Sequence, residues 1–283
     1  MPKSLASLVD IGCVVRISEE TPLFAARQAM ALAGASGAHL TIQLVVQTMK
    51  APYSPFWSGV GASLAREVND KAAGYARAVR ETLEHEIQAA GLQAEVIEAT
   101  GNLADISAGA ADAARAVDLV VLDAPRDSLD GAEHLLEDAL FRSGRPVLLA
   151  SPAQAPFASV RKVLLGWDGS AHAVRACADV MALFPGLDEI EVVTVTGERK
   201  RAASLPAESY TRHLARKGVK ATLTELPLGH DHVSRVLEAH ALKTGADVIA
   251  MGAFGHSRLR EFLLGGATLE LTQSTKVGLF LVA

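Results

Sequence analysis

Short apolar runs alternate along the chain with longer segments in which apolar residues recur every three or four positions. Nearly continuous apolar runs are typical of parallel strands buried on both faces, and the wider spacing is typical of amphipathic helices. The pattern predicts strands near Val9–Arg16, Leu40–Val46, Ala94–Glu98, Leu119–Leu122, Pro146–Ala150, Lys162–Trp167, Ile190–Thr196, Lys220–Glu225, Val248–Met251 and Gly278–Val282. This alternation predicts doubly wound parallel α/β sheets with right-handed crossovers.

The clearest helix is predicted between about Ala62 and Ala90. Its apolar stripe consists of Leu64, Val68, Tyr75, Val79, Leu83 and Ile87. A second helix is expected to begin near Ser170 and a third to follow His230. Each of these helices lies between two predicted strands, as a crossover connection requires.

The two halves of the chain resemble each other. Residues 116–122 parallel residues 245–251, with Asp118 opposite Asp247. Two further pairs of segments recur in the same order, namely 30–32 with 181–183 and 39–42 with 190–193. Repeated elements in one order indicate a duplicated domain, and 283 residues suit two domains. The boundary is expected in the proline- and alanine-rich segment 151–159, giving domains at 1–152 and 160–283.

Composition narrows the classes of function. A net charge of −5 and a pI of about 6.0 argue against broad binding to nucleic acid, which needs a basic face. Only two cysteines occur, so neither a disulfide framework nor a cysteine zinc cluster is expected. No apolar run approaches the roughly 20 residues that a membrane helix needs. We therefore expect a cytoplasmic protein that binds neither nucleic acid nor membrane.

The segment from Met251 to Thr268 carries the most specific chemical signal. It begins at the end of a predicted strand and contains four glycines. Glycine lets the backbone approach a ligand closely, and a helix that opens at Gly265 would present free N–H groups to a phosphate. In open α/β sheets, ligands bind at the carboxyl ends of strands near the topological switch point. A P-loop is excluded because the chain has no Gly-Lys dipeptide, and Gly59-Val-Gly61 lacks the remainder of a dinucleotide fingerprint.

The spacing of these glycines resembles the universal stress protein family, whose nucleotide-binding members carry G-x2-G-x9-G-[ST] after the fourth strand. Gly252, Gly255 and Gly265 match that spacing, while Gly266 stands in place of the serine or threonine. Thr268 is the candidate to supply the missing hydroxyl. The resemblance covers residues 160–283, and it covers the first half more weakly, through element order.

The resemblance implies a binding site for ATP, with or without Mg²⁺, or for ADP or AMP. Asp168 would lie on the nucleoside side, the Val195 backbone would bind adenine, and Met251 and Gly252 would lie by the ribose. The implied phosphate-side residues are Gly255, Gly265, Gly266 and Thr268, with His256, Ser257 and Arg258 as further donors. The family also implies a strand order of 3-2-1-4-5 in each domain and pairing through the last strands. The two halves would then form an intramolecular pseudo-dimer, or whole chains a homodimer.

The first half lacks this chemistry. When Asp118 is aligned with Asp247, Gly252 corresponds to Asp123 and Gly255 to Arg126. A carboxylate repels phosphate, and the equivalent of Asp168 falls near Ile17. We therefore predict one nucleotide site, in the C-terminal half.

Each of these residues also has a purely structural interpretation. The glycine segment could be a tight strand–helix connection, and Asp168 could cap the following helix. Trp167 and the two cysteines, Cys13 and Cys177, are interpreted mainly as packing residues.

Two charged segments have similar structural interpretations. His230-Asp-His232 suggests a metal site, but two histidines two residues apart face each other poorly at a helix start, so solvated or capping side chains are favoured. Arg199-Lys-Arg201 is interpreted as solvated surface, with a flap over phosphates as the minority reading.

No set of residues specifies a reaction, so no catalytic residue is predicted. The first hypothesis is a stress-response protein whose C-terminal domain binds ATP as a regulatory module. The alternatives are a weak ATPase or phosphotransfer enzyme, with Asp168 or His256 positioning the reactants, and an interaction module that binds no nucleotide.

Overall fold

The computed structural model describes residues 8–50, 58–125, 131–197, 205–253 and 266–283. The strands are β1 Asp10–Arg16, β2 His39–Gln47, β3 Ala94–Gly101, β4 Leu119–Asp123, β5 Val147–Ala150, β6 Lys162–Gly166, β7 Glu189–Thr196, β8 Lys220–Pro227, β9 Val248–Gly252 and β10 Gly278–Val282. The helices are α1 Phe24–Ser36, α2 Ser58–Ala90, α3 Leu103–Ala113, α4 Ala132–Arg142, α5 Ala171–Leu183, α6 Ala207–Arg216, α7 Val233–Thr244 and α8 Gly266–Ser274, with a short 3₁₀ turn, η1, at Ala114–Ala116. The predicted strands and the long helix are confirmed, with ends shifted by a few residues.

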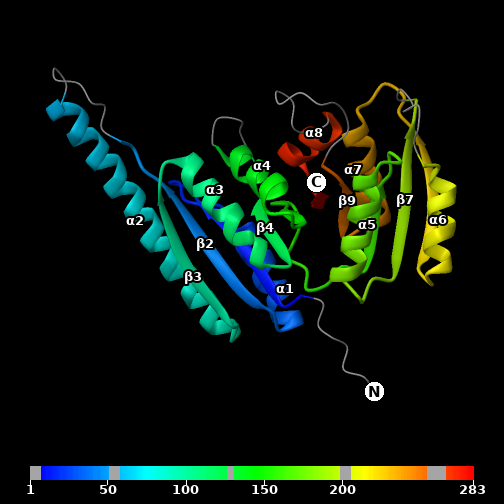
Figure 1. The fold of residues 1–283 in the computed structure, drawn as a ribbon, viewed down its shortest axis with the longest axis horizontal. Helices are drawn as coiled ribbons and strands as arrows, with labels where there is room; N and C mark the ends of the chain where they lie inside the picture. Colours follow the sequence, from blue (N-terminus) through cyan, green and yellow to red (C-terminus); the bar gives the residue numbers. More distant parts are fainter. Residues whose placement is uncertain (1–7, 51–57, 126–130, 198–204, 254–265) are drawn as a thin grey trace.

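The strands form one continuous sheet rather than two separate five-stranded sheets. Its order is β3-β2-β1-β4-β5-β10-β9-β6-β7-β8 (Figure 1). Every paired neighbour is parallel except β5 with β10, where Leu148 lies opposite Phe280 in an antiparallel ladder. Both strands are buried along their whole length, and pairing them removes two apolar sheet edges that would otherwise be exposed.

The antiparallel junction sets the direction of every strand. Because β1 to β5 run one way and β6 to β10 run the other, the carboxyl ends of the two sets lie at opposite edges of the sheet. In the C-terminal half, the chain leaves β6 on one side towards β7 and later returns on the other side at β9. The carboxyl ends of β6 and β9 therefore flank a topological switch point.

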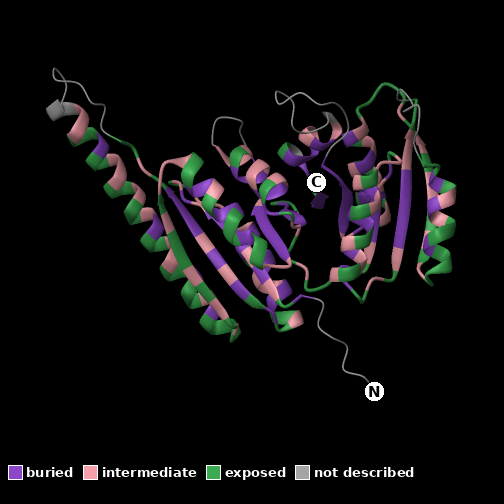
Figure 2. Cartoon of the chain, in the orientation of Figure 1, coloured by how far each residue is buried: buried purple, intermediate pink, exposed green. Residues whose placement is uncertain are grey.

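Helices cover both faces of the sheet (Figure 1). One core contains side chains from α1, α2, α5 and α6, and the other contains side chains from α3, α4, α7 and α8. Figure 2 shows buried residues along the central strands and exposed residues on the outer faces of the helices. Among the described residues, no helix is long and apolar enough to cross a membrane.

The repeat seen in the sequence has a structural counterpart at the start of each first strand. The Asp118 carboxylate accepts hydrogen bonds from the amides of Val9 and Asp10, at 2.8 and 3.1 Å. Asp247 accepts the equivalent bonds from the backbone amides at positions 161 and 162, at 2.7 and 2.8 Å. The two aspartates therefore perform the same task in the two halves, which supports their alignment.

Strand pairing corrects the register of two other alignments. Ile11 pairs with Leu119, and Val163 pairs with Val248, so counting forward places Arg16, not Ile17, at the position of Asp168. The second strands also shift by one residue, because Ile11 pairs with Leu40 and Val163 with Ile190. Sequence similarity between such apolar strands is too uniform to fix the register, whereas backbone pairing does so directly.

The segment between β5 and β6 contains no strand or helix, as predicted. The Gln28 side chain of α1 donates to the Phe157 carbonyl at 2.8 Å and accepts from the Phe157 amide at 3.1 Å. Gln154 donates to the Asp247 carbonyl at 2.9 Å and accepts from the Gly278 amide at 2.7 Å. This connecting segment is therefore attached to both halves of the sheet.

Candidate functional site

Four of the sequence-predicted site residues lie at or near the carboxyl ends of β6, β7 and β9 in the C-terminal half. Asp168 follows β6, Gly252 ends β9, and β6 and β9 are hydrogen-bonded neighbours. Val195 lies near the end of β7, on the other side of β6. Met251 precedes Gly252 and is 9% exposed. Gly255, His256, Ser257, Arg258 and Gly265 lie outside the described residues.

The turn after β6 is built by short polar contacts. The exposed Asp168 accepts a hydrogen bond from the Ser170 amide at 2.9 Å, across Gly169 with its positive φ of 75°. Ser170 is the N-cap of α5 and accepts from the Ala173 amide at 3.1 Å. Asp168 therefore shapes the turn before α5, whereas the N-cap of the helix is Ser170 and not Asp168.

Gly252 is required by the packing of α5. A Cβ atom at this position would lie 2.6 Å from the Cβ of His172 and 3.3 Å from the amide nitrogen of Ala173. Neither a side chain nor a backbone shift is easily accommodated there, because the atoms belong to the first turn of a helix. The first glycine of the motif thus lets α5 approach the end of β9 directly.

Thr268 lies in the first turn of α8 and is 3% exposed. Its hydroxyl is oriented towards the carbonyl of Gly252, with an Oγ1–O distance of 3.5 Å. The helix begins at Gly266, so its first turn contacts the end of β9. This arrangement directs the Thr268 hydroxyl towards β9, and the first backbone amides of α8 have no acceptor within the helix.

Trp167 has the packing role expected for it. Its ring stacks on Tyr210 with centroids 4.4 Å apart, and its Nε1 donates to the Leu205 carbonyl at 3.0 Å. It is only 7% exposed. Burial, followed by the neighbouring Cys177 thiol, raises the pKa of Tyr210 above its ordinary value. Trp167 thus anchors α6 to the sheet.

The corresponding switch point of the N-terminal half carries the opposite chemistry. Arg16 ends β1 at the position of Asp168, and Asp123 ends β4 at the position of Gly252. The Asp123 carboxylate accepts a hydrogen bond from the amide of Ala25, in the first turn of α1, at 2.9 Å. The Asp123 carboxylate therefore lies at the start of α1, whereas Gly252 at the equivalent position has no side chain. Arg126 lies outside the described residues.

His232 has a carboxylate partner on another helix. Within the described ranges, no three histidine, cysteine, aspartate or glutamate side chains are grouped to hold an ion. His232 is the N-cap residue of α7, and its Nδ1 lies 2.9 Å from Glu270 of α8. The contact between His232 and Glu270 was not evident in the sequence, because the two residues come from different helices.

The cysteines are buried. Burial, aided by the charge of Asp123, raises the pKa of the Cys13 thiol well above its ordinary value. Burial also raises the pKa of Cys177, although Tyr210 and Lys217 act in the opposite direction. Neither thiol is activated, which agrees with their interpretation as packing residues. Arg199-Lys-Arg201 lies outside the described residues.

A buried polar cluster was missed by sequence reasoning. Glu191 of β7 is 6% exposed and accepts from Thr224 Oγ1 of β8 at 2.7 Å. His240 Nε2 of α7 lies 2.7 Å from the same carboxylate oxygen. A glutamate in an otherwise apolar strand was the available signal. Glu191 lies near the start of β7, away from the carboxyl ends that form the candidate site.

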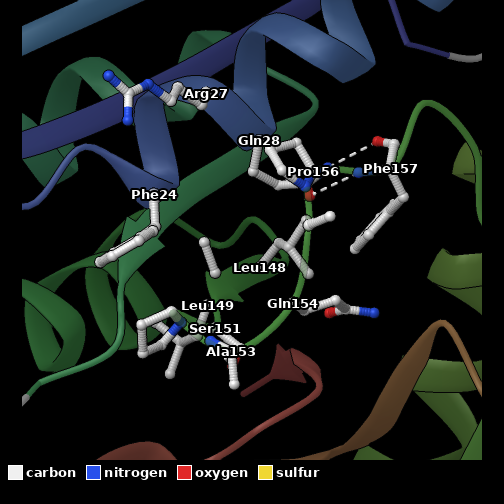
Figure 3. Close-up of a pocket in the computed structure, with 13 residues that line it drawn as sticks. Phe24, Arg27, Gln28, Leu148, Leu149, Ser151, Ala153, Gln154, Pro156 and Phe157 are labelled. Carbon is white, nitrogen blue, oxygen red and sulfur yellow. Dashed lines mark hydrogen bonds between the residues drawn. The ribbon is translucent and has the colours of Figure 1, made fainter.

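A cavity of about 290 Å³ lies beside the connecting segment (Figure 3). Its walls come from α1, from β5 and from residues 151–157. The Gln28 amide that borders it is bonded to Phe157, and the Arg27 side chain extends away from the apolar wall formed by Leu148 (Figure 3). This cavity is separate from the carboxyl ends of β6 and β9.

Comparisons with known proteins were made for the whole chain. No protein-family model matches it. A universal stress protein of Synechocystis is 25% identical over 213 residues, which cover 71% of this chain and 70% of that protein.

Solved structures match over almost the full length. A universal stress protein of Archaeoglobus fulgidus is 17% identical with a TM-score of 0.68, covering 98% of this chain and 97% of its own. A Pseudomonas aeruginosa protein described as a candidate universal stress protein is 15% identical with a TM-score of 0.56, covering 99% and 95%. The sequence relative and these solved structures are all described as universal stress proteins, so this chain is similar to that family in sequence and has its fold.

Proposed function

We propose that this protein is a stress-response module that binds an adenine nucleotide, ATP foremost, at the carboxyl ends of β6 and β9. The observation that carries the proposal is the position of Asp168 and Gly252 on the two strands that flank the C-terminal switch point. Open α/β sheets bind their ligands at such points. The glycine-rich segment that matches the family motif leaves β9 at this point and returns as α8.

The proposed roles follow the geometry of the edge. Asp168 takes the nucleoside side, the Val195 backbone takes adenine, and Met251 with Gly252 lies by the ribose. The proposed phosphate-side residues are Gly255, His256, Gly265, Gly266 and Thr268. Since the Thr268 hydroxyl is directed towards Gly252, we assign it to anchoring α8, whose N-terminal amides then face the phosphates.

We further propose that the ten-stranded sheet consists of two domains, 1–152 and 160–283, each with strand order 3-2-1-4-5. Their last strands, β5 and β10, would join them as an intramolecular pseudo-dimer. The N-terminal domain would bind no nucleotide, because Asp123 already occupies the start of α1. The setting would be the cytoplasm, and whole chains could form a homodimer.

The proposal is tested by titration calorimetry with ATP, ADP and AMP. Gly252→Asp is a poor variant, because a Cβ atom alone would collide with His172. Asp168→Asn keeps an oxygen for the Ser170 amide and removes the charge. We expect it to weaken binding by roughly ten- to a hundredfold, since a hydrogen bond to a charged group is lost.

Asp123→Asn is the matched control, because Asp123 ends the equivalent strand and also accepts a backbone amide. It should leave the affinity unchanged. Absence of binding by the wild-type protein would refute the proposal and favour an interaction module without nucleotide. Sustained release of phosphate from ATP in the same samples would instead favour the ATPase alternative.

A further inference from the structure

Helices α7 and α8 are joined by polar contacts at both ends of their interface. At the start of α7, His232 Nδ1 lies 2.9 Å from Glu270 Oε1, and Ser234 Oγ donates to Glu270 Oε2. We call these three residues the Glu270 clasp. At the other end, Glu238 of α7 accepts a hydrogen bond from the Lys276 amide, just beyond α8, at 2.7 Å.

The clasp lies next to the part of α8 that the proposed site uses. Glu270 is about one turn from Gly266, where the helix begins. The same first turn is attached to the end of β9 through Thr268 and the Gly252 carbonyl. The start of α8 is therefore fixed on one side by the sheet and on the other by α7.

The charge of Glu270 makes the clasp more than a structural contact. A carboxylate near a helix start favours the helix but opposes an anion bound at that start. Ser234, which is 4% exposed, and His232 direct this carboxylate towards α7. The charged groups beside His232 are Glu270 on α8 and, on its own segment, His230, Asp231 and Arg235.

We propose that Glu270 is a positioning residue of the nucleotide site, which His232 and Ser234 hold so that the first amides of α8 face the phosphates. The inference rests on the proposed function and extends it: the start of α7 sets the affinity for nucleotide. Because the His232 side chain is 63% exposed, its share of the effect is small.

Ser234→Ala tests the clasp, and Glu238→Gln is the matched control. Ser234→Ala removes the hydroxyl that donates to Glu270, whereas Glu238→Gln removes a charge but keeps an oxygen for the Lys276 amide. Only the first change lies by the start of α8. Calorimetry should show ATP binding weakened roughly three- to tenfold in Ser234→Ala, the size expected for one charge-assisted hydrogen bond. Glu238→Gln should stay within about twofold of wild type, and Ser234→Thr should restore most of the affinity.

Melting temperatures separate positioning from a general loss of stability. His232→Gln should weaken ATP binding by no more than about twofold, because the His232 side chain is 63% exposed. Affinities that follow the melting temperatures of Ser234→Ala and Glu238→Gln equally would overturn the inference.

Failure of the proposed function can be distinguished from failure of the clasp. If the wild-type protein binds none of the three nucleotides, the rate of hydrogen exchange at the α8 amides still measures whether the Glu270 clasp holds the helix. Faster exchange near the start of α8 in Ser234→Ala than in Glu238→Gln would show that Glu270 positions the helix. Equal exchange in the two variants would refute the clasp itself.

Discussion

At Gly252, the end of β9 lies against the first turn of α5 with no room for a side chain. We expect Gly252→Ala to lower the free energy of unfolding by about 1–3 kcal/mol, because its Cβ would lie 2.6 Å from that of His172. Gly166→Ala is the control at the end of the neighbouring strand, where the nearest atoms would be 3.5 Å away. Urea unfolding of both variants measures the difference. Equal stabilities would show that the contact is easily relieved.

Arg16 and Asp123 replace Asp168 and Gly252 in the N-terminal half, so the two switch points differ in charge as well as in shape. The Nε of Arg16 is buried and, among the described residues, has no hydrogen-bond partner. Burying an unpaired polar group costs free energy, so a site that retains such a group is not optimised for stability.

We therefore expect Arg16→Met to leave the free energy of unfolding unchanged or to raise it by up to about 1 kcal/mol. The comparison is Arg145→Met, which loses two hydrogen bonds from the Arg145 guanidinium to the Arg115 carbonyl, at 3.1 and 2.8 Å. That variant should be destabilised. Thermal or urea unfolding distinguishes them, and a marked loss of stability in Arg16→Met would contradict this prediction.

Among elements, β7, β8 and α7 are joined by the buried carboxylate of Glu191. Burial raises the pKa of Glu191, but hydrogen bonds from Thr224 and His240, together with the charges of His240 and Lys162, outweigh it and leave the pKa below its ordinary value. A carboxyl with a lowered pKa stabilises the fold above its unfolded pKa, near about 4.3, and loses this contribution as the pH falls.

Glu191→Gln should therefore cost about 1–3 kcal/mol at pH 7, and the cost should shrink as the pH falls from 5 towards 3. Urea unfolding across this range measures it. Glu95→Gln is the control, because Glu95 on β3 also contacts a threonine hydroxyl, that of Thr41 at 3.2 Å, but is exposed. Its cost should be smaller. A cost for Glu191→Gln that does not depend on pH would contradict the assignment.

The elements themselves were largely predictable from sequence, whereas their contacts were not. Apolar runs located the central strands, because strands buried on both faces carry a continuous signal. The edge strands β3 and β8, in which exposed positions recur, were also predicted. Polar contacts between distant segments, such as His232 with Glu270 or His240 with Glu191, leave no local pattern. The alignment of Arg16 with Asp168 also needed backbone pairing, because neighbouring positions in an apolar strand look alike.

Across the whole molecule, the β5–β10 junction turns two repeated halves into one sheet. Phe280 of β10 is fully buried, pairs with Leu148 and packs edge-on against Phe184, the residue after α5, with ring centroids 6.3 Å apart. We expect Phe280→Ala to cost about 3–5 kcal/mol and the variant to unfold in one calorimetric transition. Leu242→Ala, at a half-exposed position, should cost far less. Two separate transitions in the wild-type protein would show that the halves unfold independently.

The order of the strands also has a consequence during synthesis. β5 is made before β6, β7, β8 and β9, yet its second neighbour in the sheet is β10. Until the ribosome has delivered β10, the first five strands can fold only with an apolar edge open to other chains. Such an edge is a site for pairing errors in crowded conditions. Chaperone contacts on nascent chains should therefore concentrate on β5 and end when β10 emerges.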